Sequence, residues 1–209
     1  MKQRASTLLQ VPAGSSALFF NEARAHQRAV KSLSALYDSW AYVPVHTPLL
    51  DFSHPYQGIM SEADQQKVYH LVGRDGAILM LRWDVTLFLV KQVRSLIGDA
   101  PLPLRLSYAD AILRHQEQDD ISRNEYFQTG AELIGSRGPD GDLEVVLLLT
   151  EALASLGLKG ALHIGSRALF EAIFEGQDSR SLDDLALAIS LRDYKGLRQL
   201  MDEAAFKGK

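Results

Sequence analysis

The chain has 209 residues, of which 46% are hydrophobic and 23% charged, as in a globular protein with one large domain or one domain plus a small addition. The net charge of −4 gives no overall basic field, so a nucleic-acid partner is not indicated. Without cysteine or a long apolar run, the chain is expected to lack disulfides and thiolate metal sites and to be neither secreted nor membrane-spanning, which makes the cytoplasm its expected location.

The first segments are predicted to be an irregular arm, a long helix and an edge strand. Residues 1–16 mix small, polar and turn-forming types, which favours an irregular arm. Residues 17–40 carry apolar side chains at helical spacing that should cover a sheet: Val30, Leu33, Leu36, Tyr37 and Trp40. The next segment, YVPVHTPLL, contains Pro44 and Pro48, which cannot donate to a strand ladder, so it is predicted to be an edge or interface strand.

The next part of the chain is predicted to be a loop, a hairpin and a helix. Residues 52–65 are interpreted as a loop, and residues 67–72 and 77–82 as two strands joined by a Gly-rich turn. Asp84 then precedes VTLFLVKQVRSLI, which has helical spacing, with Asp84 as an N-cap candidate. Gly98 is expected to close this helix.

A second hairpin is predicted from the strand at residues 102–116 through to residue 135. Successive strand side chains alternate between faces, so Gln128, Gly130 and Glu132 should share a polar face. The opposite face should carry Phe127, Thr129, Ala131 and Leu133. Because glycine has no side chain, Gly130 is expected to let a small molecule approach the backbone. This pattern predicts a pocket for a small polar ligand.

The remaining segments complete a prediction of an α+β fold built on an antiparallel β-sheet flanked by helices. Residues 138–158 favour a buried helix, with Asp142 near its start and Gly157 past its end. Residues 159–164 are predicted to be a short strand, followed by short helical segments. The domain prediction is an arm at 1–16, a core at 17–175, and a helical extension or start of an insertion at 176–209.

Motifs for several other kinds of chemistry are absent. The six histidines show no HExxH or paired ligand spacing, so no metal site is expected. The chain also has no GxSxG motif, Walker-type loop or dinucleotide-binding fingerprint. We therefore predict no cofactor.

The order of five segments resembles the class II aminoacyl-tRNA synthetase core in its histidyl form. These segments are VPAG, the long helix, WAYVPVHTPLLD, LRWDVT and LRHQEQDDISRNEYFQTGAELIG, together covering roughly residues 10–165. Within that group the chain is most similar to the ATP phosphoribosyltransferase regulatory subunits, catalytically idle relatives of histidyl-tRNA synthetase. The resemblance implies a homodimer formed through the long helix and the strand ending at Pro48. The alternative is that Trp40, Tyr42 and Pro48 are ordinary core or edge residues.

The resemblance also implies an amino-acid pocket. In the histidyl branch the segment LRPEGT supplies an acid and a hydroxyl near the ammonium group, and here Asp84 and Thr86 take those positions. The family's arginine, glutamine and glutamate of the hairpin correspond to Arg114, Gln128 and Glu132. An arginine suits a carboxylate, while an amide and a carboxylate suit an ammonium or imidazole N–H. Alternatively, Asp84 is an N-cap and Arg114 forms a cross-strand ion pair.

The chain departs from the synthetases where they handle ATP. The glutamate that reads ATP is replaced by Gln116, and of the GRYREF-like segment only Arg123 remains nearby. Acids crowd the loop that should hold a triphosphate: Glu117, Asp119 and Asp120. No GxGxGRYD-like motif, RGLDYY segment or anticodon-binding domain follows before Lys209, so the core is expected to lack its C-terminal part and adenylate formation is not expected.

These features predict a regulatory subunit with no catalytic residues of its own. Its expected partner is the catalytic short-form ATP phosphoribosyltransferase, the first enzyme of histidine biosynthesis, with histidine as effector. The alternatives are a histidyl-tRNA synthetase-like amino-acid-activating fragment and a stand-alone amino-acid-binding module.

Overall fold

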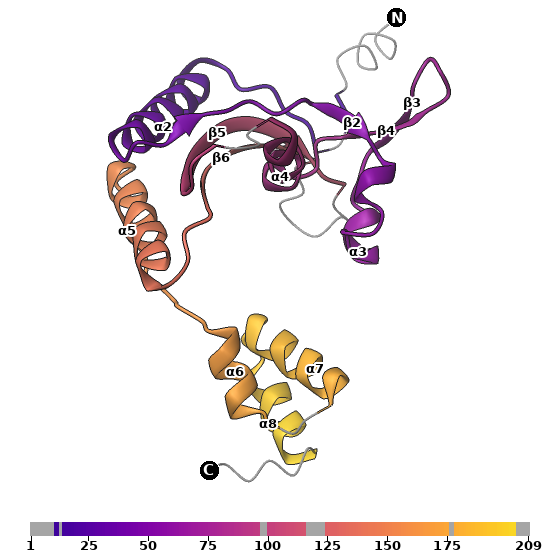
Figure 1. The fold of residues 1–209 in the computed structure, drawn as a ribbon, viewed down its shortest axis with the longest axis vertical. Helices are drawn as coiled ribbons and strands as arrows, with labels where there is room; N and C mark the ends of the chain where they lie inside the picture. Colours follow the sequence, from indigo (N-terminus) through magenta and orange to yellow (C-terminus); the bar gives the residue numbers. More distant parts are fainter. Residues whose placement is uncertain (1–10, 13, 97–99, 116–123, 176–177, 204–209) are drawn as a thin grey trace, which may run out of the picture. The chain divides into compact units, whose positions relative to one another are not determined.

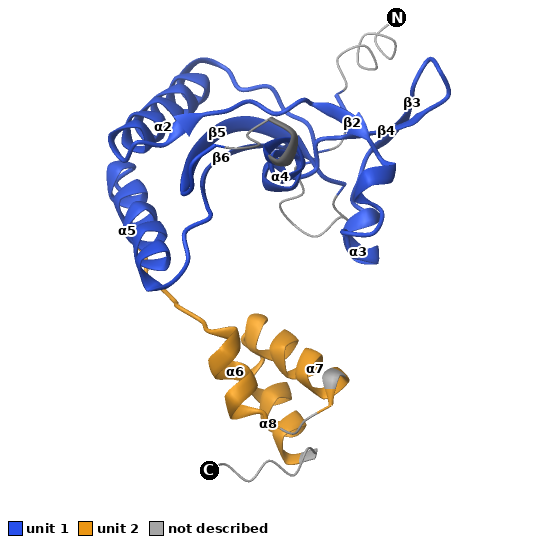
Figure 2. Cartoon of the chain, in the orientation of Figure 1, with its two compact units in different colours: residues 1–159 blue, residues 160–209 orange. Residues whose placement is uncertain are grey.

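A computed structural model describes residues 11–12, 14–96, 100–115, 124–175 and 178–203 (Figure 1). The chain forms two compact units, Met1–Lys159 and Gly160–Lys209, which are described separately (Figure 2). The sequence analysis set the end of the synthetase-like core at residue 175 instead. Compactness and family resemblance are different criteria, so that core boundary stays a prediction.

The long helix α2, Phe20–Ser39, begins three residues after the predicted start at Ala17. Its residues Leu33 and Tyr37 are buried in a cluster with Tyr42 and Leu148, and Leu36 and Trp40 pack against the same cluster. The apolar stripe predicted from helical spacing is therefore the side that covers the rest of the unit.

The first sheet of unit 1 has the strand order β1-β5-β6, with β1 at Val43–Pro44, β5 at Leu104–Leu113 and β6 at Glu125–Ile134. Strands β5 and β6 form the predicted antiparallel hairpin, in which Tyr108 lies opposite Gly130. The predicted edge strand is confirmed as β1, which pairs in parallel with β5. An edge position suits Pro44, because no further strand needs its missing N–H.

Two helices cover opposite faces of this sheet (Figure 1). Ala131 packs on the α2 cluster, whereas Tyr108 and Ile112 pack on Val85 at the start of α4, Val85–Leu96. Since Ala131 and Gly130 are consecutive on β6, and Tyr108 pairs with Gly130, these contacts come from alternate sides of the strands. The face predicted to be polar is therefore the face next to α4.

The second sheet has the order β2-β4-β3, with β2 at Leu50–Phe52, β4 at Ile78–Leu81 and β3 at His70–Val72. The β3–β4 hairpin is the one predicted, and its turn contains Gly76 with φ +83°. Strand β2 was not predicted as a separate strand. The 3₁₀ helix η1, His54–Tyr56, and α3, Glu62–Gln65, also occupy part of the segment predicted as a loop.

Helix α5, Pro139–Ser155, follows the hairpin, and Gly157 lies just past its end with φ +70°. It is held to β5 by two parallel hydrogen bonds of 2.7 Å from Arg105 to Glu144. The prediction of a buried helix is only partly correct. Leu148 is buried, but several other apolar side chains of this helix are exposed: Leu143, Val145, Leu147 and Leu149.

The described residues of unit 2 form three helices, α6 at Arg167–Ile173, α7 at Ser179–Ser190 and α8 at Tyr194–Glu203. Asp178 caps α7 by accepting backbone N–H groups through its side chain. The predicted strand at 159–164 is wrong: this segment is neither helix nor strand. Alternating apolar residues form a strand only where a partner ladder exists, and Leu162 and Ile164 are instead exposed. Among the described residues, no helix is both long and apolar enough to cross a membrane.

Candidate functional site

The β5–β6 hairpin and the start of α4 bring the five predicted site residues into one region of unit 1. Asp84 directly precedes α4, Thr86 lies in its first turn, and Arg114 directly follows β5. Gln128 and Glu132 lie on β6, on the face next to α4. Direct contacts join Asp84 to Arg114 and Thr86 to Glu132.

Asp84 both caps α4 and binds an arginine. Its Oδ1 accepts a hydrogen bond of 2.9 Å from the backbone N–H of Leu87, as the N-cap alternative predicted. Its Oδ2 lies 3.0 Å from Nη2 of Arg114. The Arg114 guanidinium also donates to the Trp83 carbonyl at 2.9 Å and stacks over the Trp83 ring at 4.7 Å. A ligand carboxylate at Arg114 would therefore share a guanidinium that already has partners in the chain.

Glu132 is a half-buried carboxylate with a hydroxyl partner. The Thr86 hydroxyl donates to its Oε1 at 2.6 Å. Burial, together with the negative charge of Asp84, raises the pKa of Glu132 above its ordinary value, and the Thr86 hydrogen bond only partly opposes this shift. A cationic or N–H-bearing ligand beside Glu132 would relieve that cost, because it would stabilise the ionised form.

The space over Gly130 is filled by Tyr108, which corrects the expectation that this glycine admits a small molecule. A Cβ built on Gly130 would lie 2.5 Å from the Tyr108 hydroxyl oxygen. The same hydroxyl accepts a hydrogen bond of 3.1 Å from the Gln128 side chain. The absence of a side chain at Gly130 therefore makes room for the Tyr108 side chain, which lies across the hairpin. Sequence reasoning missed Tyr108 because its position opposite Gly130 depends on the strand register.

Gln128 keeps one unused hydrogen-bonding group. Its Oε1 is buried and has no hydrogen-bond donor in the described structure. Buried acceptors without a partner cost free energy, so this atom favours a bound donor such as an N–H group. Together, Thr86, Gln128 and Glu132 present acceptors for an ammonium or imidazole.

The loop predicted to have lost its ATP-handling residues lies outside the described residues. This applies to Gln116, to the acids at 117, 119 and 120, and to Arg123. Their replacement is an observation on the sequence alone.

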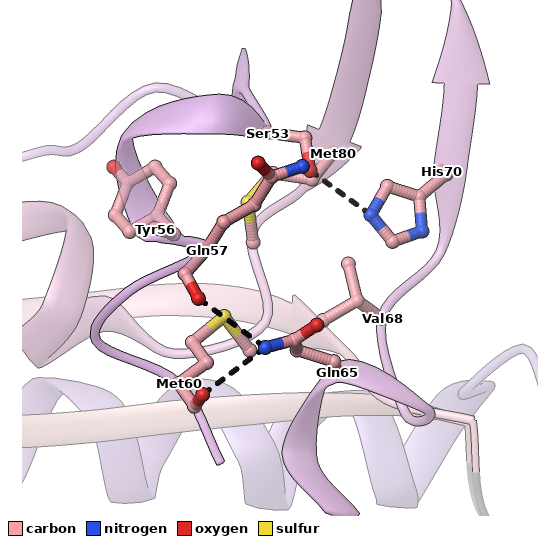
Figure 3. Close-up of a pocket in the computed structure, with 8 residues that line it drawn as sticks. All are labelled: Ser53, Tyr56, Gln57, Met60, Gln65, Val68, His70 and Met80. Atoms are coloured by element: carbon pink, nitrogen blue, oxygen red, sulfur yellow. Dashed lines mark hydrogen bonds between the residues drawn. The ribbon is translucent and has the colours of Figure 1, made fainter. Parts of the chain in front are cut away.

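A separate pocket of about 180 Å³ lies in the second sheet's part of unit 1 (Figure 3). Figure 3 shows side chains from β3, β4 and the 53–68 segment surrounding it. None of the five predicted site residues lines this pocket. Its lining consists of Ser53, Tyr56, Gln57, Met60, Gln65, Val68, His70 and Met80.

The family model that matches this chain is described as histidyl-tRNA synthetase and covers residues 15–209. The chain belongs to the histidyl-tRNA synthetase family. The α+β, class II-like fold predicted from the sequence is thereby confirmed. Asp84, Thr86 and the β5–β6 hairpin lie within the matched range, but the match does not assign a role to any residue.

Similar proteins agree with this family and point to one branch of it. An ATP phosphoribosyltransferase regulatory subunit of Moorella thermoacetica is 30% identical over 96% of this chain and 52% of its own length. A solved structure titled as an ATP phosphoribosyltransferase regulatory subunit/histidyl-tRNA synthetase from Bacillus halodurans is 27% identical, with a TM-score of 0.81 over 94% of this chain and 51% of the other. Apo S. aureus histidyl-tRNA synthetase, 18% identical with a TM-score of 0.61, shares the fold.

The chain spans about half the length of the relatives it matches. The resemblance to the regulatory-subunit branch predicted from the motifs is confirmed by these relatives. Among the described residues, no group of three or more histidine, aspartate or glutamate side chains could hold a metal ion.

Proposed function

We propose that this member of the histidyl-tRNA synthetase family serves as a non-catalytic regulatory subunit of ATP phosphoribosyltransferase in histidine biosynthesis. The observation that carries the proposal is the similarity, over 96% of this chain, to a protein named as that regulatory subunit. In this proposal the catalytic short-form transferase carries the reacting residues, and the complex works in the cytoplasm.

Histidine is the proposed effector, and the proposed site comprises Asp84, Thr86, Arg114, Gln128 and Glu132. The carboxylate of Glu132 and the unused oxygen of Gln128 suit the N–H groups of an ammonium or imidazole. Arg114 suits the carboxylate of the ligand, in competition with Asp84. Feedback requires that histidine bind one state of the complex better than another.

The enzyme alternative, a histidyl-tRNA synthetase-like fragment, has less support. Adenylate formation needs positive charge or metal around the phosphates of ATP. The sequence has Gln116 in place of the ATP-reading glutamate and acids at Glu117, Asp119 and Asp120. A synthetase-like enzyme would catalyse ATP–pyrophosphate exchange with histidine, whereas the regulatory subunit would not.

The deciding experiment is co-purification with the short-form transferase, followed by assay of the transferase with and without this chain. Capture together with a higher transferase rate supports the regulatory subunit. Failure to bind or activate the transferase would favour the stand-alone amino-acid-binding module.

The histidine site has its own test within that complex. Glu132→Ala removes a charge-assisted hydrogen bond, so calorimetry should measure histidine affinity weakened by about tenfold or more. Glu125→Ala on the same strand is the matched control, because Glu125 lies on the exposed end of β6. Unchanged affinity in Glu132→Ala would remove this residue from the site without affecting the proposed partner.

A further inference from the structure

The pocket between η1, α3 and the second sheet combines an apolar floor with a polar rim. Tyr56 and Met80 are almost fully buried beneath it, and Met60 and Val68 pack on the same cluster. At the rim, the Ser53 hydroxyl and the His70 imidazole Nε2 form a hydrogen bond of 3.1 Å with each other (Figure 3). Small-molecule sites commonly have this combination of apolar walls with a few polar groups.

The pocket is held in shape by hydrogen bonds on two sides. The Gln65 side chain donates to the backbone carbonyls of Met60, at 3.1 Å, and Gln57, at 3.4 Å, so α3 is tied to the turn that follows η1 (Figure 3). On the other side, the Tyr56 hydroxyl donates to Asp51 at 2.7 Å. A pocket formed before binding loses less conformational entropy when a ligand enters.

The part of the floor formed by Tyr56 is also fixed to helix α4. The Tyr56 ring stacks on Phe88 with centroids 5.2 Å apart, and Lys91 binds both oxygens of Asp51 at 2.6 Å. Phe88 and Lys91 belong to the helix whose first turn carries Thr86. An occupant that contacts Tyr56 would therefore press on the element that bears part of the candidate amino-acid site.

The lining also limits the charge and size of an occupant. None of the eight lining residues is aspartate, glutamate, lysine or arginine, so a charged ligand would lose hydration without gaining an opposite charge. The volume of about 180 Å³ corresponds to about six water molecules at their liquid volume, which fits a single ring.

We propose that this pocket binds an uncharged single-ring nitrogen heterocycle, with its ring between the methionine side chains and its nitrogen atoms at Ser53 and His70. The side chains of Met60 and Met80 suit a flat ring, because thioethers are polarizable and adapt to its faces. A ring with one N–H and one bare nitrogen would replace the Ser53–His70 hydrogen bond with one bond to each group, because a hydroxyl and an imidazole can each donate or accept. The site is separate from the Glu132 region and needs no transferase.

The probe for the test is pyrazole, a neutral ring with one N–H and one acceptor nitrogen. The full chain labelled at its methionine methyl groups reports directly, since Met60 and Met80 line the pocket while Met201 lies in α8. Pyrazole should shift the Met60 and Met80 signals saturably and leave Met201 unmoved. The same ring with a fixed charge, 1,2-dimethylpyrazolium, should bind about tenfold more weakly or worse.

Substitutions identify the polar end of the site. His70→Leu should weaken pyrazole binding by about fivefold, the effect of one lost hydrogen bond, while His54→Leu, a nearby histidine outside the lining, should not. If His70→Leu fails to fold, Ser53→Ala tests the other hydrogen-bonding group of the site by the same pyrazole titration. Equal shifts at Met60, Met80 and Met201, or equal binding of the charged ring, would overturn the proposal.

Discussion

At the scale of single residues, Glu132 lies where its own charge is costly. Burial and the nearby Asp84 raise its pKa, so ionisation at neutral pH reduces the stability of the folded state. The contribution of the protonated form is fully present below the ordinary glutamate pKa and is lost as pH rises through the higher folded-state pKa. Binding sites commonly contain residues that lower the stability of the folded state.

We therefore expect Glu132→Gln to be more stable than the parent chain at neutral pH and nearly equal to it in acid. The amide removes the charge but keeps an oxygen to accept from Thr86. Urea unfolding at about pH 4 and about pH 7.5, followed by tryptophan fluorescence, measures this gap in unit 1, which contains both Trp40 and Trp83. If the stability difference between Glu132→Gln and the parent chain became smaller as pH rises, the raised pKa of Glu132 would be contradicted.

The contact between Gly130 and Tyr108 makes a second prediction at this scale. Gly130→Ala would bring a methyl group within 2.5 Å of a tyrosine that is 6% exposed and cannot swing into solvent. We expect a loss of roughly 1–3 kcal/mol in the free energy of unfolding. In a double-mutant cycle, Tyr108→Ala should remove most of the added cost, whereas strictly additive losses would show that the two sites do not interact.

At the scale of secondary-structure elements, one ion pair ties α5 to the sheet. Arg105 binds both oxygens of Glu144 at 2.7 Å, and the Tyr42 hydroxyl donates to the same carboxylate at 2.9 Å. The Arg105 hydrogen bond is the main cause that lowers the pKa of Glu144, while burial raises the pKa of Tyr42 to about 12 with help from Glu144. The charged carboxylate therefore stabilises the fold above the ordinary glutamate pKa, and this contribution is lost as pH falls through the lower folded-state pKa.

Glu144→Gln should destabilise unit 1 by roughly 1 kcal/mol at neutral pH, with the difference closing in acid. The sign is opposite to that expected for Glu132→Gln, so the same pair of urea titrations separates the two carboxylates. Glu151→Gln is the matched control on α5, because the amide oxygen can still accept from the Trp40 indole N–H. An equal loss of unfolding free energy in both variants would show that the Arg105–Glu144 ion pair does not stabilise the contact between α5 and the sheet.

The elements that could be predicted from the sequence are those with local signals. Helix α4 has both its apolar spacing and its cap at Asp84 within a few residues, and the β5–β6 hairpin has long runs of alternation. Strand β2 has only three residues and pairs with β4 about thirty positions later, so no local pattern marks it. The prediction of a strand at 159–164 failed for the opposite reason, because apolar residues alternate there but no neighbouring strand in the described structure pairs with the segment.

The candidate site shows the same limit. The five residues came from motif resemblance, and α4 and the β5–β6 hairpin do bring them together. The motifs could not predict which contacts these residues make. Arg114 already binds Asp84 and the Trp83 carbonyl, and the Tyr108 side chain covers Gly130. These contacts depend on strand register and on the approach of α4, which are set by long-range packing.

At the scale of the whole molecule, the predicted homodimer depends on a surface that one chain leaves open. Strand β1 forms the edge of the first sheet, and Val43 on it is 60% exposed. An open edge with an apolar side chain can be covered by a second copy, and the family resemblance implies that the long helix and the strand ending at Pro48 form such an interface.

Val43→Glu should then weaken the dimer, because burial of a carboxylate without a partner costs several kcal/mol. Sedimentation velocity on the full chain over a concentration series should give a mostly dimeric parent and a variant displaced towards monomer by about tenfold or more in dissociation constant. Val72→Glu is the matched control, since Val72 is an exposed valine on a strand of the other sheet. If Val72→Glu dissociates the dimer and Val43→Glu does not, the second sheet forms the interface. A parent chain that is monomeric at all concentrations would contradict the predicted homodimer.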